Sequence, residues 1–377
     1  MNRAKLNVLE LVKLFYPPEV GGIEVFVNEF SHEAAKFTNL KVLCASNDSR
    51  KHLDQFEGFK AYRAPSLGKF FSLPVAPGAL WYLKQALSGI DLIHFHLPNP
   101  IFNLAWCLLN PDLPIVIQWH SDIVRQWYFM PFYQPFQTML LKRANCIVTT
   151  TPNYIDGSQY LAPFKDKCRT IPLGINPGKF TENPAMELEI RRKYPGKPIV
   201  FSLGRLIPYK GYSYLVEAAR EFDAYVLIGG EGPLRNELQQ QIRELNLSDR
   251  VFLLGGMLQK ELAAYYRACD LFALSSITRN EAFGIVQMEA MYFGRPVVST
   301  VIPGSGVSWV NQDGITGFTV PCMDAKAFGG AVKKILSNPE LASEFSTNAK
   351  QRFEELFHIR SVVQAYLQIF EEVAGNR

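Results

Sequence analysis

Short apolar runs alternate with longer segments of helical periodicity along the whole chain. The runs that we expect to form strands cover residues 6–11, 40–44, 91–95, 115–119 and 146–150 in the first half, and 198–203, 224–228, 251–254, 271–274 and 296–299 in the second. Strands that alternate with helices in this way are typical of parallel sheets covered by helices on both faces. The pattern therefore predicts an α/β protein with two doubly wound, Rossmann-like domains that face one another across a cleft.

Proline and glycine interrupt this pattern in the segment IPLGINPGKF, residues 171–180. Neither residue type favours the interior of a helix or a strand, so we place the domain boundary here. The predicted parts are a first domain (1–178), a second domain (179–358) that starts with a connecting helix and turn (181–197), and a long amphipathic helix that packs back on the first domain (359–377).

Composition narrows the class of protein. With 377 residues, of which 48% are hydrophobic, the chain is long enough for two cores. The six cysteines stand singly, without a CxxC motif or a Cys/His cluster, which predicts a reduced cytosolic protein without structural zinc. No apolar run approaches the roughly 18 residues that cross a bilayer, and the N-terminus lacks the features of a signal peptide. We therefore expect a cytoplasmic protein.

The net charge of +4 is unevenly distributed. Residues 1–180 contain 18 Lys and Arg against 13 Asp and Glu, and the remainder contains 21 against 22. This excess is too small, and too dispersed, to indicate a nucleic-acid partner. It fits an anionic acceptor or a membrane surface on the first half alone.

Two glutamates bracket a predicted helix start in NEAFGIVQMEAM. A helix over residues 284–293 leaves the backbone N–H groups of Phe283, Gly284 and Ile285 free to bind an anion. Glu281 precedes that point and Glu289 follows it by more than a turn, which predicts a separation of roughly 12 Å between the two carboxylates. Glycosidase carboxylate pairs lie roughly 5 to 9.5 Å apart, so this spacing favours one carboxylate on each side of a diphosphate.

Further polar loops follow strands of the second half. In SLGRLIPYKGY, Arg205 and Lys210 can converge on one anion. The alternative is that both side chains belong to a solvent-exposed basic loop without a ligand, which is the more common situation for such a pair. Glu231 lies in IGGEGP, which is either part of a ligand site or an ordinary turn between a strand and a helix. Met257 and Leu258, in LLGGMLQ, either contact a nucleobase or form an ordinary corner.

The first half has its own candidates at strand ends. Gly21 and Gly22, in PPEVGGIE, let a backbone approach a phosphate or sugar closely, although glycine pairs are usually turns. His120 ends a strand, before a helix expected to begin at Ser121 or Asp122. That position favours a hydrogen-bonding or proton-handling group facing the cleft.

His94 and His96, in HFHLPNP, end the preceding strand and are expected to line the same cleft. Their i, i+2 spacing directs both side chains to one face, an arrangement that also suits a metal ion. Because no third ligand is evident at a suitable spacing, we predict that no metal binds.

Together these motifs resemble the retaining glycosyltransferases of family four, which have the GT-B fold, over nearly the whole chain. The resemblance implies an acceptor-binding first domain and a nucleotide-sugar-binding second domain. It implies the following roles: Arg205 and Lys210 hold the donor diphosphate, Glu289 binds the ribose, Glu281 binds the donor sugar beside the backbone amides of Phe283, Gly284 and Ile285, Gly21 and Gly22 form the N-terminal glycine loop, and His120 is the cleft histidine near the donor sugar.

A narrower likeness lies in WHSDIVRQ, in YQP at residues 133–135 and in TPNY at residues 152–155. These segments look like bacterial mannosyltransferases of O-antigen and capsule assembly. That likeness implies GDP-mannose as donor, no cofactor, and a polyprenyl-diphosphate-linked glycan acceptor at the cytoplasmic face of the plasma membrane. A UDP-sugar donor remains the alternative, because related enzymes have similar donor loops.

The mechanism expected from these residues is metal-independent transfer of a hexose with retention of configuration. The chain has no DxD motif, and Arg205, Lys210 and the helix N-terminus offer the positive charge that the leaving phosphate requires. The rival classes are an oxidoreductase, which the absence of GxGxxG after the first strand disfavours, a sugar-nucleotide epimerase, a phosphorylase, and a sugar-nucleotide-binding protein without activity.

The acceptor side is defined less sharply by the sequence. Our candidates for contact with the acceptor are His94, His96, Asp122 and Arg125. The segment RQWYFMPFYQPF, residues 125–136, is either an aromatic surface for a bilayer or lipid-linked sugar, or a core helix with a proline kink.

Overall fold

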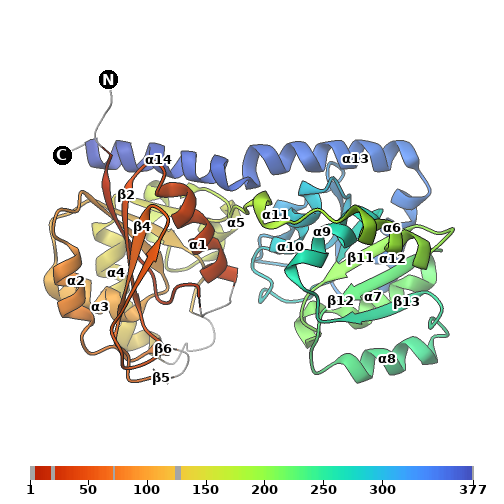
Figure 1. The fold of residues 1–377 in the computed structure, drawn as a ribbon, viewed down its shortest axis with the longest axis horizontal. Helices are drawn as coiled ribbons and strands as arrows, with labels where there is room; N and C mark the ends of the chain where they lie inside the picture. Colours follow the sequence, from red (N-terminus) through yellow and green to blue (C-terminus); the bar gives the residue numbers. More distant parts are fainter. Residues whose placement is uncertain (1–4, 18–21, 71–72, 124–128, 376–377) are drawn as a thin grey trace. The chain divides into compact units, whose positions relative to one another are not determined.

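The structure is a computed structural model that describes residues 5–17, 22–70, 73–123 and 129–375. The chain divides into two compact units (Figure 1). The first comprises residues 1–174 and 359–377, and the second comprises residues 175–358. The division falls between Gly174 and Ile175, a few residues before the predicted boundary.

The first unit is built on an eight-stranded sheet with the order β10-β9-β8-β7-β1-β2-β4-β3. All neighbours are parallel except β3 and β4. The strands are β1 (Asn7–Leu11), β2 (Asn39–Ala45), β3 (His52–Phe56), β4 (Phe59–Ala64), β7 (Leu92–Leu97), β8 (Ile115–Trp119), β9 (Cys146–Thr149) and β10 (Cys168–Thr170), and a separate hairpin consists of β5 (Lys69–Phe70) and β6 (Leu73–Pro74).

Helices cover both faces of this sheet. One face packs against α3 and α4, through Phe102, Trp106 and Leu140. The other face lies under α1 and α14, where Phe30 contacts Tyr366 with ring centroids 5.0 Å apart. The helices of this unit are α1 (Gly22–Ala34), α2 (Ala79–Ala86), α3 (Pro100–Leu109), α4 (Met130–Arg143), α5 (Pro152–Gly157) and α14 (Ile359–Gly375).

The second unit has a six-stranded, fully parallel sheet with the order β13-β12-β11-β14-β15-β16. Its strands are β11 (Ile199–Leu203), β12 (Tyr225–Gly229), β13 (Val251–Gly255), β14 (Leu271–Leu274), β15 (Val297–Val301) and β16 (Gly317–Pro321). Its helices are α6 (Pro184–Lys193), α7 (Tyr212–Ala218), α8 (Arg235–Glu244), α9 (Gln259–Ala268), α10 (Ile285–Tyr292), α11 (Val307–Val310), α12 (Ala325–Leu336) and α13 (Pro339–Arg352).

The predicted fold class of two parallel-sheet α/β units is confirmed, and all ten predicted strands are present within one or two residues of their expected ends. The sequence analysis did not predict strand β3. This edge strand alternates between half-buried and exposed residues and contains a charged residue, so it does not form an apolar run. Strand β16 was missed because glycine and proline stand at its ends.

The helix expected to begin at Ser121 or Asp122 is a wrong prediction. Residues 121–123 are not helical, and α4 begins only at Met130. The Asp122 carboxylate instead accepts hydrogen bonds from Trp119 Nε1, at 3.2 Å, and from Ser158 Oγ, at 2.8 Å. It holds a loop, as Asp side chains near turns often do.

Each sheet reverses its strand order beside its first strand. In the first unit the reversal lies between β1 and β7, and in the second between β11 and β14. Ligands of doubly wound sheets bind beyond the carboxyl ends of the strands at such a point. Within the described part of the chain, we find no helix that is both long and apolar enough to cross a membrane.

Candidate active site

At the switch point of the second unit, a lysine and a glutamate from two different loops form an ion pair. Lys210 Nζ lies 2.5 Å from Glu281 Oε2, and the Ser276 hydroxyl donates to the same oxygen at 2.8 Å. Both charged side chains are about nine-tenths buried. The two residues predicted to contact the diphosphate and the sugar therefore lie side by side.

The loop that carries Lys210 is fixed against the loop after β14. Ile277 N donates to Tyr209 O at 2.8 Å, and Ser275 Oγ donates to Lys210 O at 3.0 Å. Gly211 has φ +64, and a Cβ there would lie 2.1 Å from the Ser275 carbonyl oxygen. Only glycine fits this contact, which positions the lysine without help from a ligand.

Helix α10 begins beside this pair. Gly284 adopts the left-handed conformation, with φ +73, and is the N-cap of α10. The first turn of a helix leaves backbone N–H groups without intrahelical partners, so it attracts anions. The predicted start of the helix is thus correct to within one residue. The Ser305 hydroxyl, which the sequence analysis missed, donates to the Glu281 carbonyl oxygen and holds the approach to the helix.

Glu289 is engaged by two side chains that the sequence analysis also missed. Its Oε1 lies 2.8 Å from Lys179 Nζ, and its Oε2 accepts from the Tyr266 hydroxyl at 2.8 Å. Burial, and then the adjacent Glu289 charge, raises the pKa of Tyr266 well above its usual value, so the hydroxyl stays protonated and donates. A bound ribose would have to share this carboxylate with both groups.

The remaining donor-loop residues surround the same edge of the sheet. Arg205 is exposed, and its guanidinium makes no hydrogen bond within the described ranges. Glu231 Oε1 accepts from Gly256 N at 3.2 Å and lies 3.4 Å from Arg235. Met257 Sδ lies 2.1 Å from the position that a Cβ on Gly229 would occupy, and Leu258 is 57% exposed.

The glycines of IGGEGP have a structural reason to be there. A Cβ on Gly230 would lie 2.0 Å from Gly204 O, and a Cβ on Gly232 would lie 2.4 Å from Leu206 O. Two backbone loops therefore pack directly on each other, which keeps Arg205 and Glu231 on neighbouring loops. The glycines alone do not demonstrate a ligand site.

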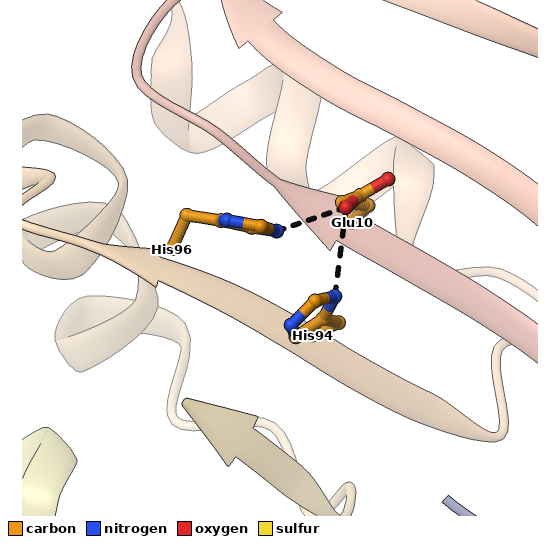
Figure 2. Close-up of side chains that lie close together, drawn as sticks. All are labelled: Glu10, His94 and His96. Atoms are coloured by element: carbon orange, nitrogen blue, oxygen red, sulfur yellow. Dashed lines mark hydrogen bonds and ion pairs between the residues drawn. The ribbon is translucent and has the colours of Figure 1, made fainter. Parts of the chain in front are cut away.

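In the first unit, the structure brings a glutamate and three histidines together under α1 and α14. Figure 2 shows Glu10 between His94 and His96. His96 Nε2 lies 2.9 Å from Glu10 Oε1, and His96 Nδ1 lies 2.9 Å from His120 Nε2. His94 Nδ1 is 3.5 Å from Glu10 Oε1. All four side chains are buried.

Burial and charge set the protonation of this cluster. Burial alone would raise the pKa of Glu10, but the adjacent His94 and the hydrogen-bonded His96 lower it to about 2. Burial lowers the pKa of His94 to about 4. Burial, followed by the nearby His96, His94 and Lys13, lowers the pKa of His120 well below its usual value. The cluster therefore holds one carboxylate, and both His94 and His120 are neutral at neutral pH.

Glu10, His94 and His96 form the group in the described ranges whose ligand atoms come close enough for a metal ion, all within 4.8 Å of one another. Our statement that no third ligand is evident was therefore wrong, because β1 and β7 are neighbours and place Glu10 opposite His94. However, Glu10 Oε1 and Oε2 already accept from His96 and, at 2.6 Å, from the Ser31 hydroxyl. The geometry is that of a hydrogen-bond network, and the absence of a bound metal stays a prediction.

The two histidines predicted to line the acceptor side differ in their placement. The His94 ring is 1% exposed and packs against Tyr366 and Phe370, at centroid distances of 5.1 and 5.3 Å. The structure therefore does not place His94 where an acceptor could reach it. His96 and His120 line a cavity of about 150 Å³ with Lys13 and Glu24.

Gly22 begins α1 next to this cavity, which Ile23 also lines. Gly21 and Arg125 lie outside the described residues. Glu10 could have been noticed in the sequence, because it is the one charged residue inside the first predicted strand, LNVLEL at residues 6–11.

Two parallel-sheet units, the second with an ion pair, a helix N-terminus and glycine-packed loops at its switch point, have the architecture of the GT-B class of glycosyltransferases. The fold agrees with a sucrose-phosphate synthase from Thermosynechococcus elongatus, with a TM-score of 0.77 at 21% identity, over 99% of this chain and 100% of that one. Residues 187–352 match the protein-family model described as Glycosyl transferases group 1. Residues 20–179 match the protein-family model described as Glycosyltransferase Family 4. The chain belongs to glycosyltransferase family four, and it is a hexosyltransferase.

Two curated relatives match almost end to end. O-antigen chain mannosyltransferase C of Escherichia coli is 31% identical over 99% of this chain and 100% of that protein. D-rhamnosyltransferase WbpZ of Pseudomonas aeruginosa is 29% identical over 93% of this chain and 92% of that protein. The oxidoreductase and the inactive binding protein are thereby set aside.

Proposed function

We propose that this enzyme transfers mannose from GDP-mannose, with retention of configuration and without a metal ion, to a lipid-linked glycan in surface-polysaccharide assembly. The observation that carries the reaction type is the Lys210–Glu281 pair beside the N-terminus of α10. The whole-length match to an O-antigen mannosyltransferase supports the sugar and the acceptor class.

The chemistry follows from charge. The C1–O bond to the β-phosphate breaks, the acceptor oxygen bonds to C1 from the same face, and the acceptor proton passes to the leaving phosphate. Negative charge accumulates on that phosphate, where Lys210, Arg205 and the α10 N-terminus stabilise it. A diphosphate would take Lys210 from Glu281, which frees that carboxylate to accept hydrogen bonds from sugar hydroxyls.

A panel of nucleotide sugars tests the donor assignment. In a thermal-shift experiment we expect GDP-mannose to raise Tm by several degrees at 1 mM, because a ligand that binds only the native state stabilises it in proportion to ln(1 + [L]/Kd). UDP-glucose, ADP-glucose and GDP-6-deoxymannose are the comparisons. A larger shift with a UDP-sugar would overturn GDP-mannose and leave the reaction type standing.

The apolar part of the first unit supports a lipid-linked acceptor. A cavity of about 320 Å³ is lined by apolar side chains, among them Leu104, Ile123 and Met130, together with Lys13. An apolar cavity with one cationic side chain suits an amphiphile whose head group is a diphosphate. Lys13 also lines the smaller cavity beside His120.

Exposed apolar residues on neighbouring helices α2, α3 and α4 favour peripheral membrane contact. Phe132 is 77% exposed, Leu108 67% and Trp81 53%. Pro135 lies inside α4, as the core-helix interpretation required, but Phe132 does not enter the core. Exposed side chains of this size can bury apolar area in the interface of a bilayer.

We expect Phe132→Ser to reduce co-sedimentation with vesicles of anionic phospholipid several-fold, because an exposed aromatic ring buries apolar area in the interface. Leu188→Ser, which removes a 57% exposed leucine from α6 in the second unit, is the matched control. Equal sedimentation of both variants and the parent protein would remove the membrane proposal.

A further inference from the structure

The carboxylate of Glu289 is fixed by donors that reach both of its oxygens. Glu289 lies in the second turn of α10, and its side chain is 8% exposed. Lys179 Nζ donates to Oε1 at 2.8 Å, and the Tyr266 hydroxyl donates to Oε2 at 2.8 Å. The last torsion of a glutamate side chain turns easily when nothing holds it. One donor at each oxygen removes that freedom, so the carboxylate has a defined plane before a ligand binds.

Tyr266 is held in the core of the second unit. The residue is 0% exposed, and its ring stacks on Phe293 with the centroids 5.4 Å apart. Phe201 and Phe272 lie against the same ring, at centroid distances of 5.3 and 5.7 Å. Because the interior is closely packed on these sides, the ring cannot turn without displacing its neighbours. The hydroxyl therefore stays at Glu289 Oε2.

Lys179 is held less tightly, through the residue that follows it. Phe180 is buried and packs on Tyr292 and Phe293 at the end of α10, at centroid distances of 5.8 and 5.1 Å. The Lys179 ammonium lies 5.2 Å from the centroid of the Phe180 ring, and the lysine side chain is 20% exposed. The lysine therefore reaches Glu289 from a segment anchored on α10, and the whole arrangement belongs to the second unit.

The arrangement leaves room for a diol at the same carboxylate. An ionised carboxylate has about four acceptor positions, two on each oxygen. Among the residues that the structure describes, Lys179 and Tyr266 take one position on each oxygen and leave one on each oxygen open. The two adjacent hydroxyls of a ribose are two donors at a fixed spacing, which suits one open position on each oxygen. The lysine and the tyrosine therefore prepare the carboxylate for the diol without blocking it.

We propose that Lys179 and Tyr266 are positioning residues, which hold the Glu289 carboxylate in the plane that receives the 2′- and 3′-hydroxyls of the donor nucleotide. The nucleotide as the ligand rests on the proposed function, whereas the fixed carboxylate does not. An acceptor arranged in advance improves affinity, because less freedom is lost when the ligand binds. The ribose is remote from the bond that breaks, so its contacts contribute equally before and during the reaction and are measured as binding.

Calorimetric titration with GDP and with 2′,3′-dideoxy-GDP tests this role, because the second nucleotide lacks both hydroxyls. We expect Lys179→Met to weaken GDP binding about tenfold, the scale of one hydrogen bond to a charged group. The same variant should change the binding of dideoxy-GDP by less than about twofold, as expected of groups that do not interact. Tyr266→Phe removes only the hydroxyl and should behave in the same way. If Lys179→Met does not fold, Tyr266→Phe decides alone, because it keeps the packed ring.

Two matched controls come from the same unit. Lys197 pairs with Asp223 at 2.7 Å, and the Tyr225 hydroxyl donates to Pro195 O at 3.3 Å, both in exposed positions. Lys197→Met and Tyr225→Phe should leave both affinities unchanged. An equal loss for GDP and dideoxy-GDP overturns the positioning role, because a disturbed fold weakens both nucleotides alike. Unchanged or tighter GDP binding to Lys179→Met also overturns it, and tighter binding would show that the lysine competes with the ribose.

Failure of the proposed donor is distinguishable from failure of the positioning role. A parent protein that binds UDP but not GDP contradicts only the guanine base of the proposed function, and the same comparison is then made with UDP and 2′,3′-dideoxy-UDP. A parent protein that binds GDP and dideoxy-GDP equally tightly overturns the positioning role, while GDP-mannose stands as the donor.

Discussion

Lys210→Ala is expected to lower the rate of sugar transfer by about 10²- to 10³-fold, the usual cost of removing one preorganised group that stabilises charge in the transition state. The Lys210 ammonium pairs with Glu281, 2.5 Å away, and lies 5.6 Å from the centroid of the Tyr209 ring. The effect is measured as donor turnover at saturating acceptor. Arg205→Ala should lower the rate by a smaller factor, because the Arg205 side chain is exposed and becomes ordered only when the ligand binds.

Lys210→Ala also leaves Glu281 largely buried without its partner, which destabilises the fold by up to roughly 3–5 kcal/mol. The double variant Lys210→Met/Glu281→Gln removes both charges and should recover stability without recovering activity. Lys197→Ala, which breaks the pair with Asp223 in the same unit, is the matched control and should be neutral. A Lys210→Ala enzyme that retains full activity would falsify our assignment of the leaving-group site.

The sequence was sufficient for ten strands of the two large sheets and for the loops that carry chemistry. These ten strands are short apolar runs bounded by polar loops, so each could be predicted alone, and position after a strand located Lys210, Glu281 and His120. This works because parallel strands end at one edge of the sheet, whatever the rest of the structure does.

The partners of these residues could not be predicted. Lys179 and Tyr266 reach Glu289 from segments far away in the sequence, and only the packed fold brings them together. Glu10 meets His94 because β1 and β7 are neighbours, although 84 residues separate them. Strand order is a property of the whole sheet, and the spacing of motifs along the chain does not contain it.

Retention of configuration without a metal ion is the second large expectation. The positive charge that metal-dependent transferases take from a divalent cation is supplied here by Lys210, Arg205 and the α10 N-terminus, so EDTA should leave the rate within about twofold of its original value. An enzyme that needs a metal for its leaving group should instead lose nearly all of its activity.

The most direct measurement tests retention of configuration and independence of a metal ion in one reaction. GDP-mannose and a synthetic alkyl-diphosphate-linked mannoside are incubated with the enzyme in excess EDTA, and the anomeric configuration of the new linkage is read from the one-bond carbon–proton coupling at C1. The account predicts an α-linked product, formed at the rate seen without EDTA. A β-linked product, or loss of activity that Mg²⁺ restores, would contradict it.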